Sequence, residues 1–366
     1  MAGAATEFDT ARRDALVERI FGAALGTYET LIVYLGEQLG FYRALAERGA
    51  CTPRELAAAT GTHERYVREW LEQQAVTGLL EVEDVETAAE ERRYGLPVEY
   101  AEVLLDQESL SYVMPMARFA GSFTGALPAL QEAFRTGGGV PWTTFGADGR
   151  EAQAGANRPL FANLLGSEWL PALPDVHGRL EADPPARVAD IACGAGWSSI
   201  GIARAYPKAH VDGFDLDENS VQMANENVAA AGLADRVRVE ARDAGDPELR
   251  GSYQLVTVFE ALHDMSRPVE VLGAMRGLAA EDGAVLVMDE KVADAFTAPG
   301  DEVERLMYSY SVLSCLAVGL SEQPSAGTGT VMRTGTLRRY AEEAGYSRVE
   351  VLPIEHEIFR FYRLYP

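Results

Sequence analysis

The amino-acid sequence predicts an α/β protein in which a doubly wound, mostly parallel sheet follows a mainly helical domain. Three observations support this prediction. From residue 187 onward, short apolar segments alternate with helix-like segments at the spacing of strand–helix units. A glycine-rich turn follows the first apolar segment, and acidic residues follow several others, as at the ligand-binding edge of such a sheet. Before residue 107, apolar positions recur at helical spacing instead.

Composition limits the classes of protein to which the chain can belong. Its 366 residues are 47% hydrophobic, which suits two domains or one domain with a large extension. It has no run of about 18 uncharged apolar residues and no apolar signal core near the start, so we expect a cytoplasmic protein that does not enter membranes. The net charge of −24 disfavours nucleic acid and anionic membranes as partners. Cys51, Cys193 and Cys315 are far apart, which argues against disulfides and a zinc site.

The N-terminal domain, residues 1–106, has the pattern of a winged helix-turn-helix. Thr52 and Glu55 form a capping-box motif with Pro53 at the first helical position, which predicts the start of a short helix. The predicted elements are a helix over 11–48, a short helix over 53–59, a helix over 63–76 and a two-stranded ribbon of 79–82 with 94–96.

Such a domain often binds DNA through the helix predicted here at 63–76. That helix has two arginines among three glutamates, and residues 1–110 contain 10 basic and 21 acidic side chains. Phosphate would repel a surface of this kind. We therefore interpret the domain as a dimerisation and substrate-lid module.

Residues 107–186 are predicted to be a helical connector and lid. Apolar residues between Met114 and Phe134 suit a packed pair of helices. Glycines at 137–139 and 146–149 predict turns, and residues 157–170 predict a helix beside the next domain.

The remaining domain, 187–366, is predicted to bind the ligand at the carboxyl ends of its strands. An insertion over about 292–333 precedes a helix at 336–344 and two strands, 348–353 and 357–362, which we expect to form an antiparallel hairpin. The residues at predicted strand ends are Asp190, Asp215, Asp243, Phe259 and Asp289.

A strand-like segment, a glycine-rich turn and the start of a helix follow one another in VADIACGAGWSS. Gly194 and Gly196 let the backbone approach a ligand closely, and Asp215, about 20 residues further on, is placed to accept hydrogen bonds from a ribose. Ser199 stands where a dinucleotide turn has its third glycine. Asp190 would repel a pyrophosphate but suits a ligand with an ammonium and a sulfonium. A dinucleotide site and a purely structural turn remain alternatives.

The pattern Asp190-x-x-x-Gly194-x-Gly196, followed by Gly213-Phe214-Asp215, resembles the first two motifs of class I S-adenosylmethionine-dependent methyltransferases. The resemblance implies a Rossmann-like sheet and S-adenosylmethionine as the cofactor. It also implies that an acid after the third strand accepts a hydrogen bond from the adenine amino group. The implied cofactor contacts are Asp190, Gly194, Gly196, Asp215, Leu216, Asp243, Ala244 and Phe259.

His263 follows the fourth predicted strand and is the candidate general base. The stretch around it is similar to small-molecule O-methyltransferases of plants and bacteria, in which a His-Asp pair follows this strand and the histidine is the base. An ordinary pKa of about 6.5 suits that role. Asp289 corresponds to the acid that orients the histidine, although the plant enzymes have a longer glutamate there. The alternative is a histidine that takes no part in catalysis.

The whole chain resembles bacterial two-domain small-molecule methyltransferases, which implies a homodimer formed through the N-terminal domains and a substrate pocket between domains. Core packing is the alternative for the aromatic candidates. The substrate candidates are Asn157, Phe145 and Trp169 near the methionine end of the cofactor, and Met307, Tyr308 and Ser311 in the insertion.

We expect methyl transfer from S-adenosylmethionine to a small, aromatic or polyketide-like metabolite of secondary metabolism, most simply at oxygen and without a metal. One alternative is an enzyme of the same fold that uses the cofactor for decarboxylation, hydroxylation or cyclisation. The other is a winged-helix regulator that senses a metabolite.

Overall fold

The computed structural model describes residues 8–246 and 248–366. The chain divides into two compact units, Met1–Gly121 and Ser122–Pro366. The three-part division with boundaries at 106 and 186 remains a prediction. None of the helices in the described residues combines the length and the hydropathy that crossing a bilayer requires.

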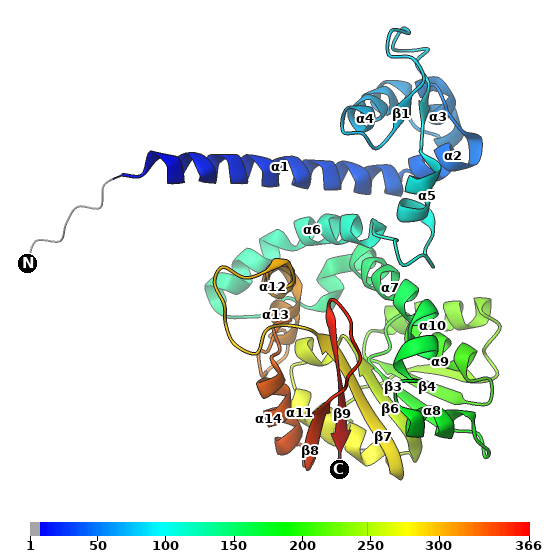
Figure 1. Ribbon diagram of the computed structural model, residues 1–366, viewed down its shortest axis with the longest axis vertical. Helices are drawn as coiled ribbons and strands as arrows, with labels where there is room; N and C mark the ends of the chain where they lie inside the picture. Colours follow the sequence, from blue (N-terminus) through cyan, green and yellow to red (C-terminus); the bar gives the residue numbers. More distant parts are fainter. Residues whose placement is uncertain (1–7, 247) are drawn as a thin grey trace, which may run out of the picture. The chain divides into compact units, whose positions relative to one another are not determined.

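The N-terminal unit has the predicted helices and short antiparallel ribbon of a winged helix-turn-helix (Figure 1). Its capping box is present: the Thr52 hydroxyl accepts from the Glu55 N–H (3.3 Å), and the Glu55 carboxylate accepts from the Thr52 N–H (2.9 Å). The elements are α1 (Thr10–Gln38), α2 (Phe41–Arg48), α3 (Pro53–Thr60), α4 (Glu64–Val76), β1 (Glu81–Val82), β2 (Tyr94–Gly95) and α5 (Val98–Leu105).

The single helix predicted over 11–48 is wrong, because the chain bends between α1 and α2. Gly40 has a φ of 72°, a left-handed conformation that glycine adopts without steric cost. The bend turns Phe41 and Tyr42 into the core of the unit, where they are 3% and 0% exposed. Local helical periodicity runs through this bend, so the pattern alone did not reveal it.

The second unit is built on a seven-stranded sheet with the order β5-β4-β3-β6-β7-β9-β8. The strands from β5 to β7 in this order pair in parallel, and β9 is antiparallel to both β7 and β8. The doubly wound sheet and its terminal antiparallel hairpin are thereby confirmed. The strands are β3 (Arg187–Ile191), β4 (His210–Asp215), β5 (Val237–Ala241), β6 (Tyr253–Phe259), β7 (Ala279–Glu290), β8 (Arg348–Val351) and β9 (Phe359–Tyr365).

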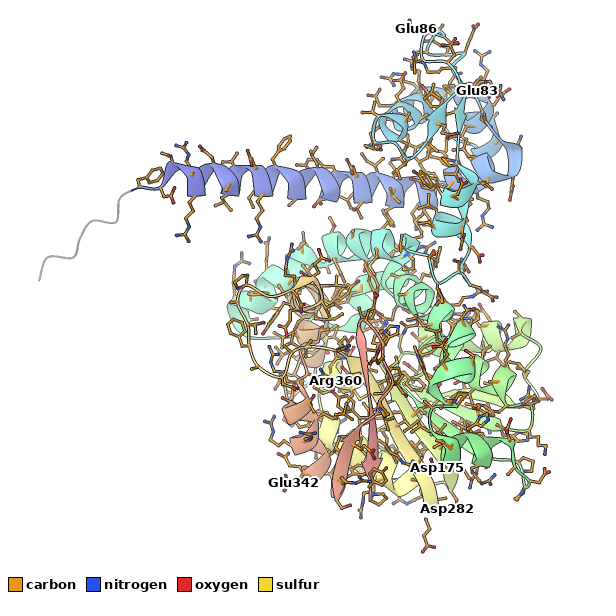
Figure 2. The ribbon with its side chains drawn as sticks, viewed as in Figure 1. Glu83, Glu86, Asp175, Asp282, Glu342 and Arg360 are labelled. Atoms are coloured by element: carbon orange, nitrogen blue, oxygen red, sulfur yellow. The ribbon has the colours of Figure 1, made fainter. Side chains whose placement is uncertain are left out.

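Successive side chains of each strand point to opposite faces, so the sheet has a hydrophobic core on each side. One core packs against α8 (Pro174–Glu181), α9 (Trp197–Ala205) and α10 (Glu218–Ala230); the other packs against α11 (Pro268–Leu278) and α14 (Thr334–Glu343) (Figure 1). A two-pronged ion pair between Arg363 of β9 and Asp175 of α8 links a helix to the antiparallel edge (3.0 and 2.5 Å). Asp175 is labelled in Figure 2.

Helix α7 (Gly146–Asn163) starts earlier than predicted, so the turn expected at 146–149 is wrong. Gly149 packs against Ser122 of an earlier helix, where a Cβ would lie 3.1 Å from the Ser122 Oγ, and that hydroxyl donates to the Phe145 carbonyl (2.8 Å). Tertiary packing, which local glycine content does not report, therefore makes this segment helical. The other elements are α6 (Met114–Thr136), a π-helical turn at Leu165–Trp169, α12 (Glu302–Tyr310), a second π-helical turn at Ser311–Cys315 and α13 (Leu316–Gly319).

Candidate active site

The glycine-rich turn after β3 lies against the carboxylate at the end of β4. Gly194 and Gly196 have φ values of 52° and 78°, which favour glycine. The Gly194 N–H donates to Asp215 Oδ2 (2.8 Å), and the Asp217 N–H donates to Asp215 Oδ1 (2.9 Å). No atom lies within 4 Å of the point where a Cβ on Gly194 would be, so there is open space beside the turn. The predicted turn and the predicted ribose-binding acid are thus brought together.

Asp190, predicted as a cofactor contact, points into the protein instead. Its carboxylate is 1% exposed and accepts hydrogen bonds from Ser198 (2.6 Å), Ser199 (2.7 Å) and Thr257 (2.8 Å). Burial raises the pKa of Asp190, while the three hydroxyls favour its ionised form. Asp190 therefore fixes the start of α9 to β6. Ser199, in the place of a dinucleotide turn's third glycine, is part of this support.

The residues predicted around the adenine lie at the ends of β4 and β5. Leu216 directly follows Asp215 and is 62% exposed. Asp243 accepts from Arg267 Nη2 (3.2 Å) and from the Gly245 N–H (2.8 Å), so its side chain is already oriented. Ala244 packs against the core on the α11 side. Phe259 is 8% exposed, and the centroid of its ring lies 5.5 Å from that of Phe161. Its side chain therefore packs in the core and offers little surface to a ligand.

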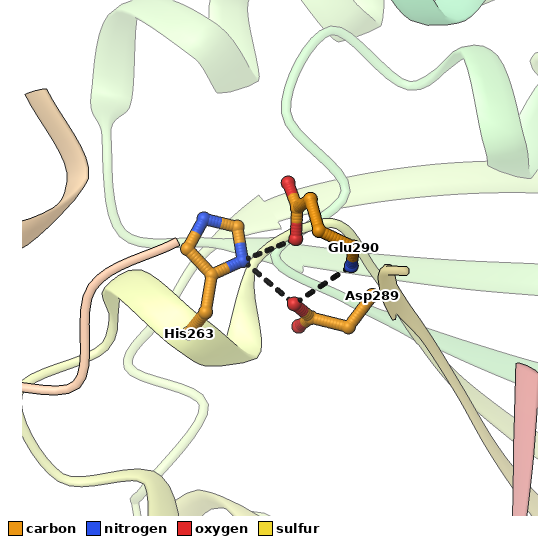
Figure 3. A group of neighbouring side chains, drawn as sticks. All are labelled: His263, Asp289 and Glu290. Atoms are coloured by element: carbon orange, nitrogen blue, oxygen red, sulfur yellow. Dashed lines mark hydrogen bonds and ion pairs between the residues drawn. The ribbon is translucent and has the colours of Figure 1, made fainter. Parts of the chain in front are cut away.

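His263 lies between two carboxylates, as Figure 3 shows. It follows β6 in a short 3-10 turn, Leu262–Asp264, and is 3% exposed. Its Nδ1 is 2.9 Å from Asp289 Oδ1 and 2.9 Å from Glu290 Oε2, two residues that end the neighbouring strand β7. The shorter side chain of Asp289 therefore reaches the ring. The other ring nitrogen, Nε2, points away from both carboxylates (Figure 3).

Burial and charge act in opposite directions on this group. Burial lowers the pKa of His263, but the charges of Glu290 and Asp289 outweigh it and raise the pKa well above its usual range. Burial also raises the pKa of Glu290, well above its usual range, whereas the positive His263 overcomes burial at Asp289 and lowers the pKa of that residue. The pKa shifts thus favour the ionised form of Asp289 and the protonated form of Glu290, and the two carboxyl groups titrate as a coupled pair. Glu290 was not among the predicted catalytic residues, although its place beside Asp289 could have indicated it.

The insertion contributes groups beside the base. The Cys315 thiol lies close enough to His263 to help raise the pKa of that residue, and it is partly buried. Burial raises the pKa of Tyr310, whose ring packs edge-on against Phe123 with centroids 5.9 Å apart. These contacts place the π-helical turn after α12 against the catalytic edge of the sheet.

Glu260, which the sequence reasoning also missed, follows Phe259 directly. Its φ of 53° is unusual for a residue with a side chain. Glu260 Oε2 accepts from Gln153 Nε2 of α7 (3.0 Å), and the Asn157 side chain also hydrogen-bonds this carboxyl group. Burial raises the pKa of Glu260 to about 7. The rule that singled out Asp190 and Asp215, an acid at a strand's carboxyl end, also applies to it.

The other substrate candidates are mostly core residues. Phe145, Trp169 and Met307 are 3%, 3% and 2% exposed. Trp169 packs on Phe361 with ring centroids 4.8 Å apart, a contact that agrees with the core-packing alternative. Large apolar side chains at helical spacing are more often core than pocket. Ser311 is buried at the π-helical turn, Tyr308 is 38% exposed with its hydroxyl accepting from Arg333 (3.3 Å), and of the six only Asn157 is brought to Glu260.

His263, Asp289 and Glu290 also form a group whose possible metal-ligating atoms all lie within 4.8 Å of one another. The His263 nitrogen in this group already interacts with both carboxylates. A hard divalent cation would need more oxygen ligands than these two side chains offer. The absence of a metal requirement stays a prediction.

Comparison with known proteins agrees with this geometry. Residues 182–345 match the methyltransferase-domain family, and residues 27–105 match the Rv2258c-like winged helix-turn-helix domain. Residues 182–345 are a methyltransferase domain. The predicted methyltransferase sheet and winged-helix domain are confirmed.

Several curated proteins and solved structures are similar to the chain. The 3-hydroxy-5-methyl-1-naphthoate 3-O-methyltransferase of Streptomyces sahachiroi is 28% identical over 288 residues, 76% of this chain and 78% of that enzyme. A ubiquinone biosynthesis O-methyltransferase of Ralstonia nicotianae is 31% identical over 34% of this chain and 48% of that enzyme. The chain spans less than half the length of the first curated relatives that it matches.

Among solved structures, the mitomycin 7-O-methyltransferase has a TM-score of 0.70 at 21% identity, covering 98% of this chain and 99% of that one. Human N-acetylserotonin methyltransferase, solved with S-adenosylmethionine, has a TM-score of 0.68 at 17% identity over 99% of both chains. At these identities the likeness establishes the fold of the methyltransferase domain and its N-terminal partner.

Proposed function

We propose that the protein is an S-adenosylmethionine-dependent methyltransferase acting on a hydroxyl group of a small molecule. The observation that supports this most strongly is the buried His263 with Asp289 and Glu290 at the carboxyl edge of the sheet. A histidine held at Nδ1 by a carboxylate leaves Nε2 to accept a proton from the acceptor. General-base assistance of this kind contributes about 10²- to 10⁴-fold in rate.

The residues at the ends of β3, β4 and β5 fit the proposed cofactor. The open space beside Gly194 lets a ligand approach the turn, Asp215 offers carboxylate oxygens to the ribose, and the exposed Leu216 offers an apolar surface to the adenine. When bound, S-adenosylmethionine supplies a methyl carbon activated by its sulfonium. The protein then has to align acceptor and methyl group, which lowers the barrier by roughly 7–11 kcal/mol in well-oriented reactions.

The acceptor class follows from the relatives only as a proposal. The similar enzymes named above act on a naphthoate, a mitomycin and N-acetylserotonin, according to their names. We infer an aromatic or polyketide-like metabolite of secondary metabolism as the acceptor here. Because the proposed cofactor is a metabolite of the cytoplasm, we also propose that location.

We further propose a homodimer formed through the N-terminal unit. Helix α1 has a series of exposed apolar side chains, and only Gly36 is buried in it. Exposed apolar surface of this extent is typical of an interaction site. The exposed apolar residues include Leu16, Val17, Ile20, Phe21, Leu25 and Tyr28.

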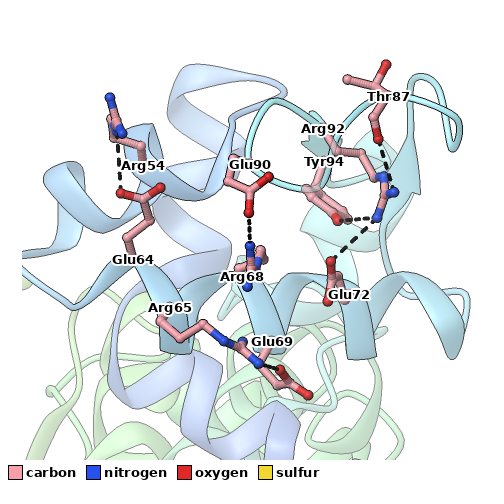
Figure 4. A network of polar contacts seen from close by, with 10 residues as sticks. All are labelled: Arg54, Glu64, Arg65, Arg68, Glu69, Glu72, Thr87, Glu90, Arg92 and Tyr94. Carbon is pink, nitrogen blue, oxygen red and sulfur yellow. Dashed lines mark hydrogen bonds and ion pairs between the residues drawn. The ribbon is translucent and has the colours of Figure 1, made fainter.

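The same unit is unsuited to DNA. The arginines on and beside α4 are paired with glutamates: Arg65 with Glu69 on α4 itself, and Arg68 with Glu90 (Figure 4). A paired arginine gains little from a phosphate because it must first lose its carboxylate. We therefore expect no mobility shift of genomic DNA fragments at low salt; a salt-sensitive shift would favour the metabolite-sensing regulator instead.

The direct test is product analysis with methyl-labelled S-adenosylmethionine and a panel of aromatic hydroxy acceptors. The proposal requires products heavier by one labelled methyl group. Consumption of acceptor without a mass gain from the label would indicate another cofactor-assisted reaction. His263→Ala should retain cofactor affinity and lose most of its turnover; unchanged turnover would remove His263 from the mechanism.

A further inference from the structure

Glu260 occupies a position in the sheet where a ligand contact is expected. Strand β6 pairs in parallel with β3, with Ile191 opposite Val258, so Glu260 lies level with the glycine-rich turn. Ala192 and Glu260, just past the ends of these two strands, both have a φ of 53°. Left-handed backbone at residues other than glycine costs free energy and is concentrated at functional sites.

Two amide side chains from one helix hold the Glu260 carboxylate. Gln153 and Asn157 are four residues apart on α7 and therefore lie on one face of it. Gln153 Nε2 donates to Glu260 Oε2 (3.0 Å), and the Asn157 side chain acts on the same carboxyl group to lower its pKa. Neutral donors position a carboxylate without adding a positive charge that would compete with a cationic ligand.

The same helix contacts the loops after β4 and β3. Arg150 lies 3.9 Å from Asp217, beyond the end of β4, and the Arg158 guanidinium lies over the Trp197 ring, 4.2 Å from its centroid, where α9 begins. Helix α7 thus touches the carboxyl ends of the three strands that border the proposed cofactor site. Glu260 and its amide partners belong to that border.

Four other acids of this edge have defined partners. Asp190 is held by three hydroxyls, Asp215 accepts two backbone N–H groups, and Asp289 and Glu290 face the base. The sequence matched Asp190 to an ammonium, but the carboxylate of this residue points into the protein, away from the open space beside Gly194. The cationic end of an amino acid therefore needs a different acid.

We propose that the Glu260 carboxylate, positioned by Gln153 and Asn157, binds the α-ammonium group of the cofactor's amino-acid end. This inference rests on the proposed function. An ammonium donates hydrogen bonds that carboxylate oxygens accept, whereas a sulfonium has no proton to donate. A carboxylate that stabilised the sulfonium would also slow methyl transfer, because the sulfonium charge disappears in the transition state. The ammonium charge is unchanged by the reaction, so Glu260 contributes binding without opposing catalysis.

The test is calorimetric titration of the full chain and of Glu260→Gln with three probes: S-adenosylhomocysteine, its analogue with hydrogen in place of the α-ammonium, and methylthioadenosine, which lacks the amino-acid end. Loss of a charge-assisted hydrogen bond should weaken S-adenosylhomocysteine by roughly 10- to 100-fold. Binding of the other two probes should change less than about twofold, because the group that Glu260 binds is missing from them.

Equal weakening of all three probes, or unchanged S-adenosylhomocysteine affinity, would overturn the inference. If the unaltered protein binds none of the probes, the proposed function itself fails. Glu342→Gln makes the same chemical change on the exposed surface of α14, far from the edge (Figure 2), and should leave every affinity unchanged. Gln153→Met, which removes one donor but keeps the carboxylate, provides a second variant: it should weaken S-adenosylhomocysteine and spare methylthioadenosine. In turnover, Glu260→Gln should raise the KM for S-adenosylmethionine and leave kcat nearly unchanged.

Discussion

Asp289 and Glu290 should share one negative charge, and a double-mutant cycle can show this. Both carboxyl groups lie 2.9 Å from His263 Nδ1, yet the pKa of Asp289 is lowered while that of Glu290 is raised well above its usual range. Removing the charge from Asp289 leaves Glu290 free to ionise in its place. Asp289→Asn and Glu290→Gln should therefore each cost less than about tenfold in kcat, whereas the double variant loses the charge altogether.

The size of the double-variant effect follows from Coulomb's law. Two unit charges about 4 Å apart interact by about 4 kcal/mol at an effective dielectric constant of 20. Since each 1.36 kcal/mol corresponds to a factor of ten in rate, complete loss of the charge limits the fall in kcat to about 10³-fold. That value lies within the range that general-base assistance contributes.

The pH dependence gives a second readout of the same cycle. His263 is active as a base only when it is neutral, so kcat/KM should rise as pH increases through its pKa. Because burial alone lowers this pKa and the carboxylates raise it, removing both carboxylates should move the acid limb of the profile to lower pH. Steady-state rates of methyl transfer at a series of pH values measure both the acid limb of the kcat/KM profile and its plateau at higher pH. Single-variant losses that multiply to give the double-variant loss would refute charge sharing.

Three other substitutions test the support of the site and the assembly of the chain. Asp190→Ala should lower the free energy of unfolding by about 3 kcal/mol in urea titrations, because three buried hydroxyls lose their acceptor; an unchanged value would contradict its role as a support. Gly194→Ala should abolish S-adenosylhomocysteine binding, because the new Cβ occupies the open space beside the turn and strains a left-handed backbone. Gly178→Ala in α8 is the control: this glycine has no left-handed φ and has room for a Cβ, so binding should stay intact. Replacing Ile20 and Phe21 of α1 by glutamate should convert a dimer to a monomer in light scattering; a dimer that persists would place the interface elsewhere.

The sequence allowed the turn, the strand ends and the acids after them to be predicted, because these depend on short-range patterns. Glycine is required at Gly194 and Gly196 by their left-handed backbone, and the alternation of strands and helices places the acids at one edge. The direction in which each acid points depends instead on distant packing. Asp190 points inward because Thr257, 67 residues further along the chain, meets it there.

The same limit explains the residues that were missed or misplaced. Glu260 acquires its role from Gln153, 107 residues earlier in the chain, on a helix that was predicted to start only at 157. Trp169 and Met307 were plausible pocket residues by type, but helical periodicity does not say which face of a helix meets the core. Residue type and spacing thus indicate where in the sheet the site lies, and long-range contacts determine which side chains face the ligand.

The acids of this edge also explain how a chain with a net charge of −24 can hold several carboxyl groups in one place. Burial raises the pKa of Asp190, Asp215 and Glu290, and it raises the pKa of Glu260 to about 7, so burial opposes ionisation at each of these acids. A neutral ligand would gain nothing from ionising them. A ligand with two positive charges would stabilise the ionised forms, and the free energy of that ionisation would add to its binding. The acid-rich edge therefore suits the cationic amino-acid end of a ligand, whose charge methyl transfer leaves unchanged, better than it suits a neutral ligand.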